Sequence, residues 1–166
     1  TAEDVDIAVM DAAAVSANNR GVGLMGRYDY EAALQLFKEL DSQYPAITEF
    51  RFNLAVALMN RQREGDETSA LAMFTDLAAR QPEDVRVTYC AGLLEYRRGE
   101  LATAAGLFER VLQGDPADAY AAYFLGQSLQ QQGDVPGIVL AVAVQGHDPL
   151  VAGGGDAGPQ GGTLTP

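Results

Sequence analysis

The chain has 166 residues, 48% of them hydrophobic, and carries 11 Lys and Arg against 23 Asp and Glu, a formal net charge of -12. Nucleic-acid binding is therefore not expected, because contacts to phosphates need clustered basic side chains. The charge also argues against an anionic membrane surface. Since the longest apolar run, 138–144, is too short to cross a bilayer, no direct membrane insertion is expected. The single cysteine, Cys90, excludes an internal disulfide and a multi-cysteine metal site.

Residues 1–14 are acidic and rich in alanine, and we expect them to form a helical N-terminal extension. Their carboxylates would face solvent and complement the positive end of a helix dipole. The segment either extends the first helix or caps the open end of the units that follow. Because the sequence starts at Thr1 rather than Met, we expect a processed form or a segment of a longer protein.

A pattern of four residues then recurs three times, with gaps of four, three and five residues between a small residue, an aromatic, an aliphatic and a proline. The first three positions lie on one face of a helix, and the proline marks where that helix stops. Because the last two copies are 34 residues apart, the sequence predicts stacked helical hairpins rather than one compact core. The copies are Ala33, Phe37, Leu40 and Pro45; Ala70, Phe74, Leu77 and Pro82; and Ala104, Phe108, Val111 and Pro116.

A second amphipathic helix precedes each copy, and each such helix has a small residue where two helices would approach closely. These small residues are Gly21, Ala55 and Gly92, and Gly126 holds the same place in a fourth such helix, which no copy follows. Gly99 and Gly133 are placed to end such a helix in the left-handed conformation. The second unit has about three extra residues, which fall in the polar stretch 61–66 and predict an enlarged turn.

Helices are predicted over 4–25, 30–43, 47–62, 67–80, 84–97, 101–113 and 118–131. Asp84 and Asp118 each follow a proline closely, and we expect both to be N-caps. The fold class is therefore all-α.

The periodic pattern fails after Asp134, so 135–166 is expected to be irregular: first apolar, then rich in Gly and Pro and flexible from Gly153 onward. Two interpretations stay open. The segment is not the native continuation of the repeats, or it is a cap that packs on the last helix. In the second case the packing residues would be Ile138, Leu140, Val142 and Val144.

The repeated units resemble the tetratricopeptide repeat (TPR) family over about 15–133. The third unit matches best, while the first has Tyr28 where the family has a turn glycine, and the fourth matches only in its first helix. The resemblance implies a right-handed superhelical solenoid of three hairpins plus a partial fourth, with repeats at 15–47, 48–84, 85–118 and 119–134. The matching residues of the third unit are Gly92, Gly99, Ala104, Phe108, Val111 and Pro116.

The resemblance also implies a function. TPR proteins are usually non-catalytic scaffolds or adaptors that bind a peptide or a partner protein in a concave groove lined by the first helix of each repeat. The alternative is self-assembly into a homo-oligomer through the exposed end of the array. Some segments look like TPR segments of larger, often exported, bacterial proteins, which leaves a cytoplasmic or an exported location open.

The groove has a polar half and an aromatic half when the family's groove positions are carried over to this sequence. Asparagine amides can bond the backbone of an extended peptide, and tyrosines add apolar area with a hydroxyl. Arginines in the groove of an acidic protein could select an acidic side chain. The candidate ligand-binding residues are Asn18, Val22, Asn53, Asn60, Arg86, Tyr89, Tyr96, Arg97, Tyr123 and Gln127; Leu93, Tyr120 and Phe124 hold further groove positions.

Other kinds of site are not expected. The TPR subclass that grips a terminal carboxylate is matched outright only by Asn53 among Asn18, Val22, Asn53, Arg86 and Cys90. The Gly-rich stretch 21–26 fits a dinucleotide fingerprint in letters but does not follow a strand. Cys90 is expected to pack as a small hydrophobe, and the single histidine, His147, to lie in a solvated turn. We therefore expect no enzyme activity, no metal site and no cofactor.

Overall fold

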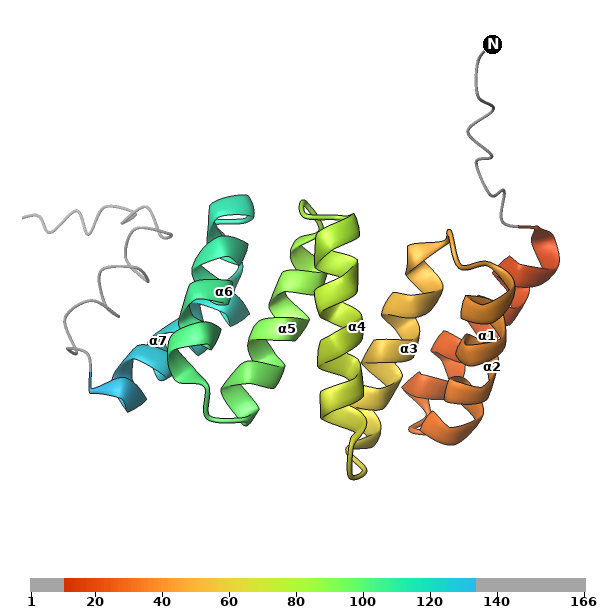
Figure 1. Cartoon of the computed structure of the whole chain (residues 1–166), viewed down its shortest axis with the longest axis horizontal. Helices are drawn as coiled ribbons and strands as arrows, with labels where there is room; N and C mark the ends of the chain where they lie inside the picture. Colours follow the sequence, from red (N-terminus) through yellow and green to blue (C-terminus); the bar gives the residue numbers. More distant parts are fainter. Residues whose placement is uncertain (1–10, 134–166) are drawn as a thin grey trace, which may run out of the picture.

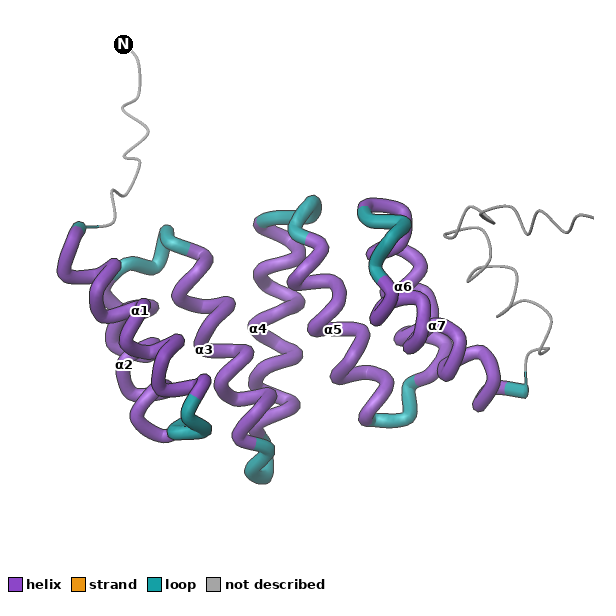
Figure 2. Tube along the Cα trace, turned by 180° about the vertical axis from the view of Figure 1, so that it is seen from behind, coloured by secondary structure: helices purple, strands orange, loops and turns teal. Residues whose placement is uncertain are grey.

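The computed structural model describes residues 11–133, which form seven α-helices and, within that range, no strand. Figure 1 shows the helices side by side along the long axis, from α1 and α2 at one end to α7 at the other. Each helix packs against the next, and α1, α3, α5 and α7 also contact one another in turn. The same row is seen from behind in Figure 2. The predicted all-α repeat solenoid is confirmed. The helices are α1 (Ala12–Gly26), α2 (Tyr30–Gln43), α3 (Thr48–Arg61), α4 (Asp66–Arg80), α5 (Val85–Arg97), α6 (Leu101–Gly114) and α7 (Ala119–Gln132).

Aspartates start four of the helices by accepting hydrogen bonds from backbone N–H groups that lack a helical partner. The predicted N-caps Asp84 and Asp118 are confirmed: Asp84 accepts from the N–H of Arg86 and Asp118 from that of Ala121, at 3.0 and 2.9 Å.

The helix predicted over 4–25 does not run through Asp11, whose backbone is extended, with φ -71° and ψ 164°. The Asp11 carboxylate accepts from the N–H of Ala14 at 2.7 Å and from the hydroxyl of Tyr44 at 2.8 Å. These two bonds make Asp11 the N-cap, so α1 begins at Ala12. Residues 1–10 lie outside the described part of the chain, as do the expectations made for 135–166.

The repeated positions identified in the sequence form the core. Phe37, Phe74 and Phe108 have no exposed surface, and neither do the small residues that precede each of them by one helical turn. Two clusters of buried side chains result, one from α1 to α5 and one from α6 to α7. Tyr89 and Leu93 of α5 pack against both clusters, so they join the two parts of the core.

Two glycines allow the paired helices to approach closely, as predicted. A Cβ atom at Gly21 would lie 2.6 Å from Cζ of Phe37, and one at Gly92 would lie 3.1 Å from Cε1 of Phe108. The aromatic ring of the second helix therefore rests on the bare backbone of the first.

The turns that end the first helices use the left-handed conformation. Gly99 and Gly133 have φ of 80° and 79°, which confirms their predicted role. Tyr28 takes the same conformation at the end of α1, with φ of 62°, although a side chain is uncommon there. Its ring meets that of Tyr30 edge-on, with centroids 6.3 Å apart.

The extra residues of the second repeat lie only partly in the turn between α3 and α4: 62–65 has four residues against three after α1 and α5, and the others lengthen α3 and α4. Asp66 is buried at the start of α4, where its carboxylate accepts two hydrogen bonds from the Arg61 guanidinium, at 2.8 and 2.7 Å, and one from the N–H of Arg63 at 2.9 Å. Arg61 also reaches Glu31 of α2 at 2.8 Å. The Arg61 guanidinium is the main cause of a lowered pKa at Asp66.

None of the helices within residues 11–133 combines the length and the apolar composition that crossing a bilayer requires.

A matched pair of glycines in α1 tests the close helix approach. Gly21→Ala should lower the free energy of unfolding by about 1–3 kcal/mol, because the new methyl group overlaps the packed Phe37 ring. Gly23→Ala, on the same helix with open space around it, should raise it by about 0.5–1 kcal/mol through helix propensity. Urea denaturation followed by circular dichroism measures both. Equal effects of the two substitutions would contradict this packing.

The buried Asp66 predicts a pH dependence. Its pKa in the folded chain lies below the ordinary 3.8, so its contribution to stability is present above pH 3.8 and is lost as the pH falls through the folded-state pKa. Asp66→Asn should therefore cost about 2 kcal/mol near neutral pH and much less at about pH 2. Denaturation of both proteins across this range measures the difference, and a difference that does not change with pH would refute the assignment.

Candidate functional site

A pocket of about 720 Å³ lies between α5 and α7, on the surface formed by the first helices. Five of its eight lining residues are aromatic. The structure brings together here four of the predicted groove residues, Tyr89, Tyr96, Arg97 and Tyr123. We call this feature the aromatic pocket; it is lined by Tyr89, Leu93, Tyr96, Arg97, Ala119, Tyr120, Tyr123 and Phe124.

Helical spacing explains why these side chains share one site. Tyr89, Leu93 and Tyr96 are four and three residues apart on α5, and Tyr120 and Tyr123 are three apart on α7, so each set lies on one face of its helix. Phe124 lies between the two sets.

The Phe124 ring holds the wall of the pocket in place. It stacks on Phe108 of α6 with centroids 5.6 Å apart, and it meets the rings of Tyr89, Tyr96 and Tyr123 edge-on at 6.5, 5.4 and 5.2 Å. Such edge-on and offset contacts are the favoured arrangements of aromatic rings. The pocket is therefore preformed by core packing.

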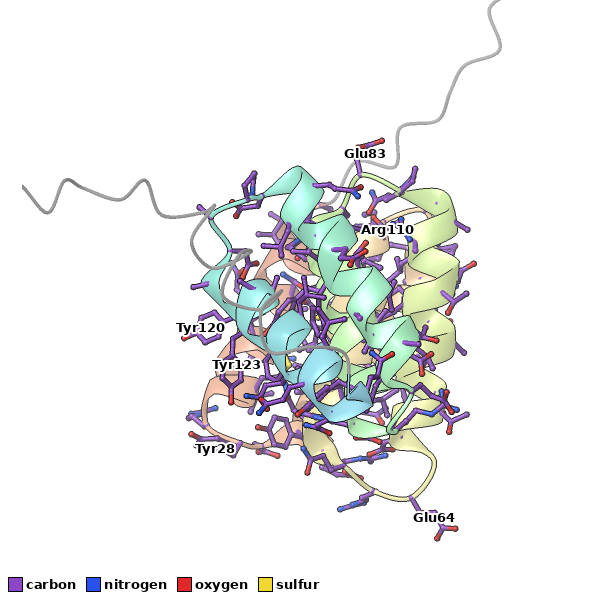
Figure 3. All side chains as sticks on the ribbon, turned by 90° about the vertical axis from the view of Figure 1, so that its left-hand side faces the viewer. Tyr28, Glu64, Glu83, Arg110, Tyr120 and Tyr123 are labelled. Atoms are coloured by element: carbon purple, nitrogen blue, oxygen red, sulfur yellow. The ribbon has the colours of Figure 1, made fainter. Side chains whose placement is uncertain are left out.

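The tyrosines differ in exposure. Tyr120 and Tyr123 are 72% and 59% exposed, and Figure 3 shows them on α7 at the same side of the molecule as Tyr28. Tyr96 is half-buried, and its hydroxyl accepts a hydrogen bond from Nε2 of Gln131 at 2.6 Å. Burial, and then the negative charge of Asp118, raises the pKa of Tyr89.

Arg97 is engaged within the protein at one end of the pocket. Its guanidinium donates to the backbone carbonyl of Met59, in α3, at 3.2 Å and pairs with Glu67 of α4 at 3.6 Å. Arg97 therefore ties α5 to the preceding repeat.

Arg86 lies outside the pocket and is also paired. Its guanidinium contacts Asp84 at 2.8 Å and Glu49 at 3.1 Å, and it lies over the ring of Phe52 at 4.6 Å from the centroid. The sequence suggested that Arg86 and Arg97 select an acidic side chain. An acidic ligand would have to compete with the carboxylates that both arginines already contact.

The polar half of the predicted groove is not part of the aromatic pocket. Asn53 is buried, and its Nδ2 donates to Oδ1 of Asn18 at 2.8 Å, which joins α3 to α1. Asn60 and Val22 are exposed, and Gln127 is half-buried on α7. The ten predicted residues therefore divide into four around one pocket and six elsewhere.

The remaining sequence signals have structural explanations. The Gly-rich stretch 21–26 lies entirely within α1, so it lacks the strand-to-helix turn of a dinucleotide site. Cys90 is buried in the core, and burial raises the pKa of its thiol to about 11, which keeps it protonated at neutral pH. In residues 11–133 no three potential metal ligands of the His, Cys, Asp or Glu type gather.

Sequence reasoning missed two aspects of the site. Ala119 lines the pocket although it precedes the family's groove positions, and its small side chain gave no signal. The internal partners of Asn53, Arg86 and Arg97 also went unnoticed, because pairing across repeats depends on helix offsets that spacing within one repeat does not give.

Comparisons with known proteins agree with this architecture. A sequence model described as tetratricopeptide repeat matches 60–119 and 91–137. No curated protein gives a significant match.

Three solved structures illustrate the structural likeness. The MamA RS-1 ArsTM double mutant superposes with a TM-score of 0.73 at 24% identity, over 85% of this chain and 78% of that one. YrrB, a TPR protein with an unusual peptide-binding site, gives 0.68 at 18% identity, over 83% and 71%. The first TPR of Spaghetti (RPAP3), bound to the HSP90 peptide SRMEEVD, gives 0.65 at 18% identity, over 72% and 92%. The predicted resemblance to tetratricopeptide repeat proteins is therefore confirmed, in sequence over 60–137 and in fold by these structures.

Proposed function

We propose that the chain is a non-catalytic protein–protein interaction module, a scaffold or adaptor, that binds a peptide or a segment of a partner protein. The observation that carries this proposal is the aromatic pocket, in which Tyr120 and Tyr123 expose most of their surface beside a fixed Phe124. Two structures of the same fold, YrrB and the RPAP3 repeat, are described with a peptide site or a bound peptide, which supports the proposal.

A partner would gain affinity by inserting an apolar side chain between α5 and α7. Rings that core packing already holds lose little conformational entropy on binding, so more of the buried area contributes to affinity. The chain of the ligand would continue along α3, where the exposed Asn60 offers an amide group to a peptide backbone, whereas the amides of Asn53 and Asn18 already bond each other.

A non-catalytic role is proposed because the residues around the pocket carry no nucleophile paired with a base. Among the residues that line it, the titratable groups are tyrosines and Arg97. A general acid or base would need a pKa near the working pH, and the pKa of Tyr89 moves upward, away from it.

A matched pair of exposed tyrosines tests the site. Short random-sequence peptides displayed on phage are selected against the full chain, and the selected peptides are resynthesised with a fluorescent label. Tyr123→Ala should weaken their binding at least about tenfold, because it removes a ring from the pocket. Tyr28→Ala, which removes an 81% exposed tyrosine outside the pocket, should leave binding unchanged.

Fluorescence anisotropy gives the dissociation constants, and circular dichroism checks that both variants keep their helices. Peptides that bind equally well to the wild type and to Tyr123→Ala would place the binding site elsewhere. Failure to select any peptide would count against the proposal as a whole.

Self-assembly is the second candidate, favoured by the same exposed Tyr120 and Tyr123 on the last described helix. A second copy that covers these rings would bury the apolar pocket. Light scattering at rising protein concentration separates the candidates: a dimer that dissociates on Tyr123→Ala supports self-assembly, whereas a monomer at all concentrations supports a pocket for a different partner.

A further inference from the structure

We infer that the partner segment carries an arginine or lysine, and that its cationic group lies over the rings of Tyr120 and Tyr123 beside the carboxylate of Asp118. This inference rests on the proposed function and names the chemistry of the ligand for the aromatic pocket. Two features of the pocket favour a cationic side chain over an aliphatic one: its lining is mostly aromatic, and a carboxylate lies at the start of α7.

The first argument is the composition of the lining. Leu93 and Ala119 are its aliphatic members, whereas five rings supply the rest. An aromatic face is negative and attracts cations, and the attraction is stronger where water is excluded. The chain already contains such a pair, because the Arg86 guanidinium lies 4.6 Å from the centroid of the Phe52 ring.

The second argument is the charge at the α7 side of the pocket. The sequence has no Lys or Arg after Arg110, while Asp115 and Asp118 directly precede α7. The Asp118 carboxylate is fixed at the N-terminus of α7, because it accepts hydrogen bonds from the backbone N–H groups of Tyr120 and Ala121 at 3.0 and 2.9 Å. A cation placed there gains both a carboxylate and an aromatic face.

Arg97 sets the orientation of the ligand. It is the cationic member of the lining, next to Tyr96 on α5, and its guanidinium points to the carbonyl of Met59 and to Glu67. The pocket therefore has an already paired cation at the C-terminal end of α5, and at the start of α7 a carboxylate with which no Lys or Arg of residues 11–133 pairs. A basic side chain gains a carboxylate at the α7 end.

The chain's own tail does not supply the proposed cation, because residues 134–166 contain no Lys or Arg. The net charge of -12 for the whole chain would favour the approach of such a basic partner.

The test uses fluorescently labelled peptides of the form Leu-Xaa-Leu-Xaa-Leu between Gly-Ser flanks, in which Xaa is arginine, lysine, glutamine or glutamate. Anisotropy titrations against the full chain should give the tightest binding for arginine, then lysine, glutamine and glutamate. The arginine peptide should bind about tenfold more tightly than the glutamine peptide. Equal binding of all four would overturn the inference but leave the proposed function standing. Absence of binding by every peptide would overturn both.

Variants separate the aromatic contribution from the general negative charge. The double substitution Tyr120→Leu with Tyr123→Leu keeps the apolar area and the net charge but removes the aromatic faces, so it should abolish the preference for arginine over glutamine. The double substitution to Phe should keep that preference. A preference that survives the leucine variant comes from general charge and would overturn the inference.

Two N-cap aspartates give a matched test of the carboxylate. Asp118→Asn should weaken arginine-peptide binding about threefold, because it removes the local charge while an asparagine still caps α7. Asp29→Asn removes the same charge at the N-cap of α2, at the other end of the array, and should change nothing. Equal losses in the two variants would overturn the placement of the cation. The inference would also be overturned if the chain formed dimers in which a second copy covers the aromatic pocket and prevents every peptide from binding.

Discussion

The contact of a phenylalanine ring with the backbone of a glycine fixes the spacing on which the rest of this structure depends. In the first and third hairpins, Phe37 and Phe108 lie against Gly21 and Gly92, where a methyl group would already overlap or crowd the ring. This contact sets how closely the two helices of a hairpin approach. Since each hairpin packs on the next, the same spacing determines where the first helices present their outer faces.

The aromatic pocket is a direct product of that packing. The Phe108 ring lies against Gly92 and also stacks on Phe124, which lines the pocket. Phe108 therefore belongs to the core and supports the wall of the pocket. Tyr89 and Leu93 likewise pack against both buried clusters and line the pocket. A ligand seated there would therefore contact side chains that also hold the two parts of the core together. In this fold the binding surface and the core share residues.

Much of the fold could be predicted from the sequence because it depends on local periodicity. Helix bounds from Tyr30 onward differ from the expected ones by one residue at most, since prolines, glycines and aspartates mark the ends. The start of α1 was missed because the hydrogen bond between Asp11 and Tyr44 joins residues that are far apart in the chain. The site was predictable in part. Tyrosines at helical spacing share a face, but Glu49 and Glu67, which pair with Arg86 and Arg97, lie on α3 and α4 of the preceding repeat, whose offset the sequence does not show.

The longer turn of the second repeat means that its hairpin could not be exchanged for one of regular length without effects elsewhere in the array. Arg61 bridges Glu31 and Asp66 at that turn, and the adjacent Glu67 and the nearby Met59 carbonyl both hold Arg97, a wall of the pocket one repeat further on. Replacing the second repeat with one of regular length would move these partners and release Arg97. Modular exchange of hairpins, which repeat proteins generally tolerate in engineering and recombination, would here alter a surface that the exchanged hairpin does not itself form.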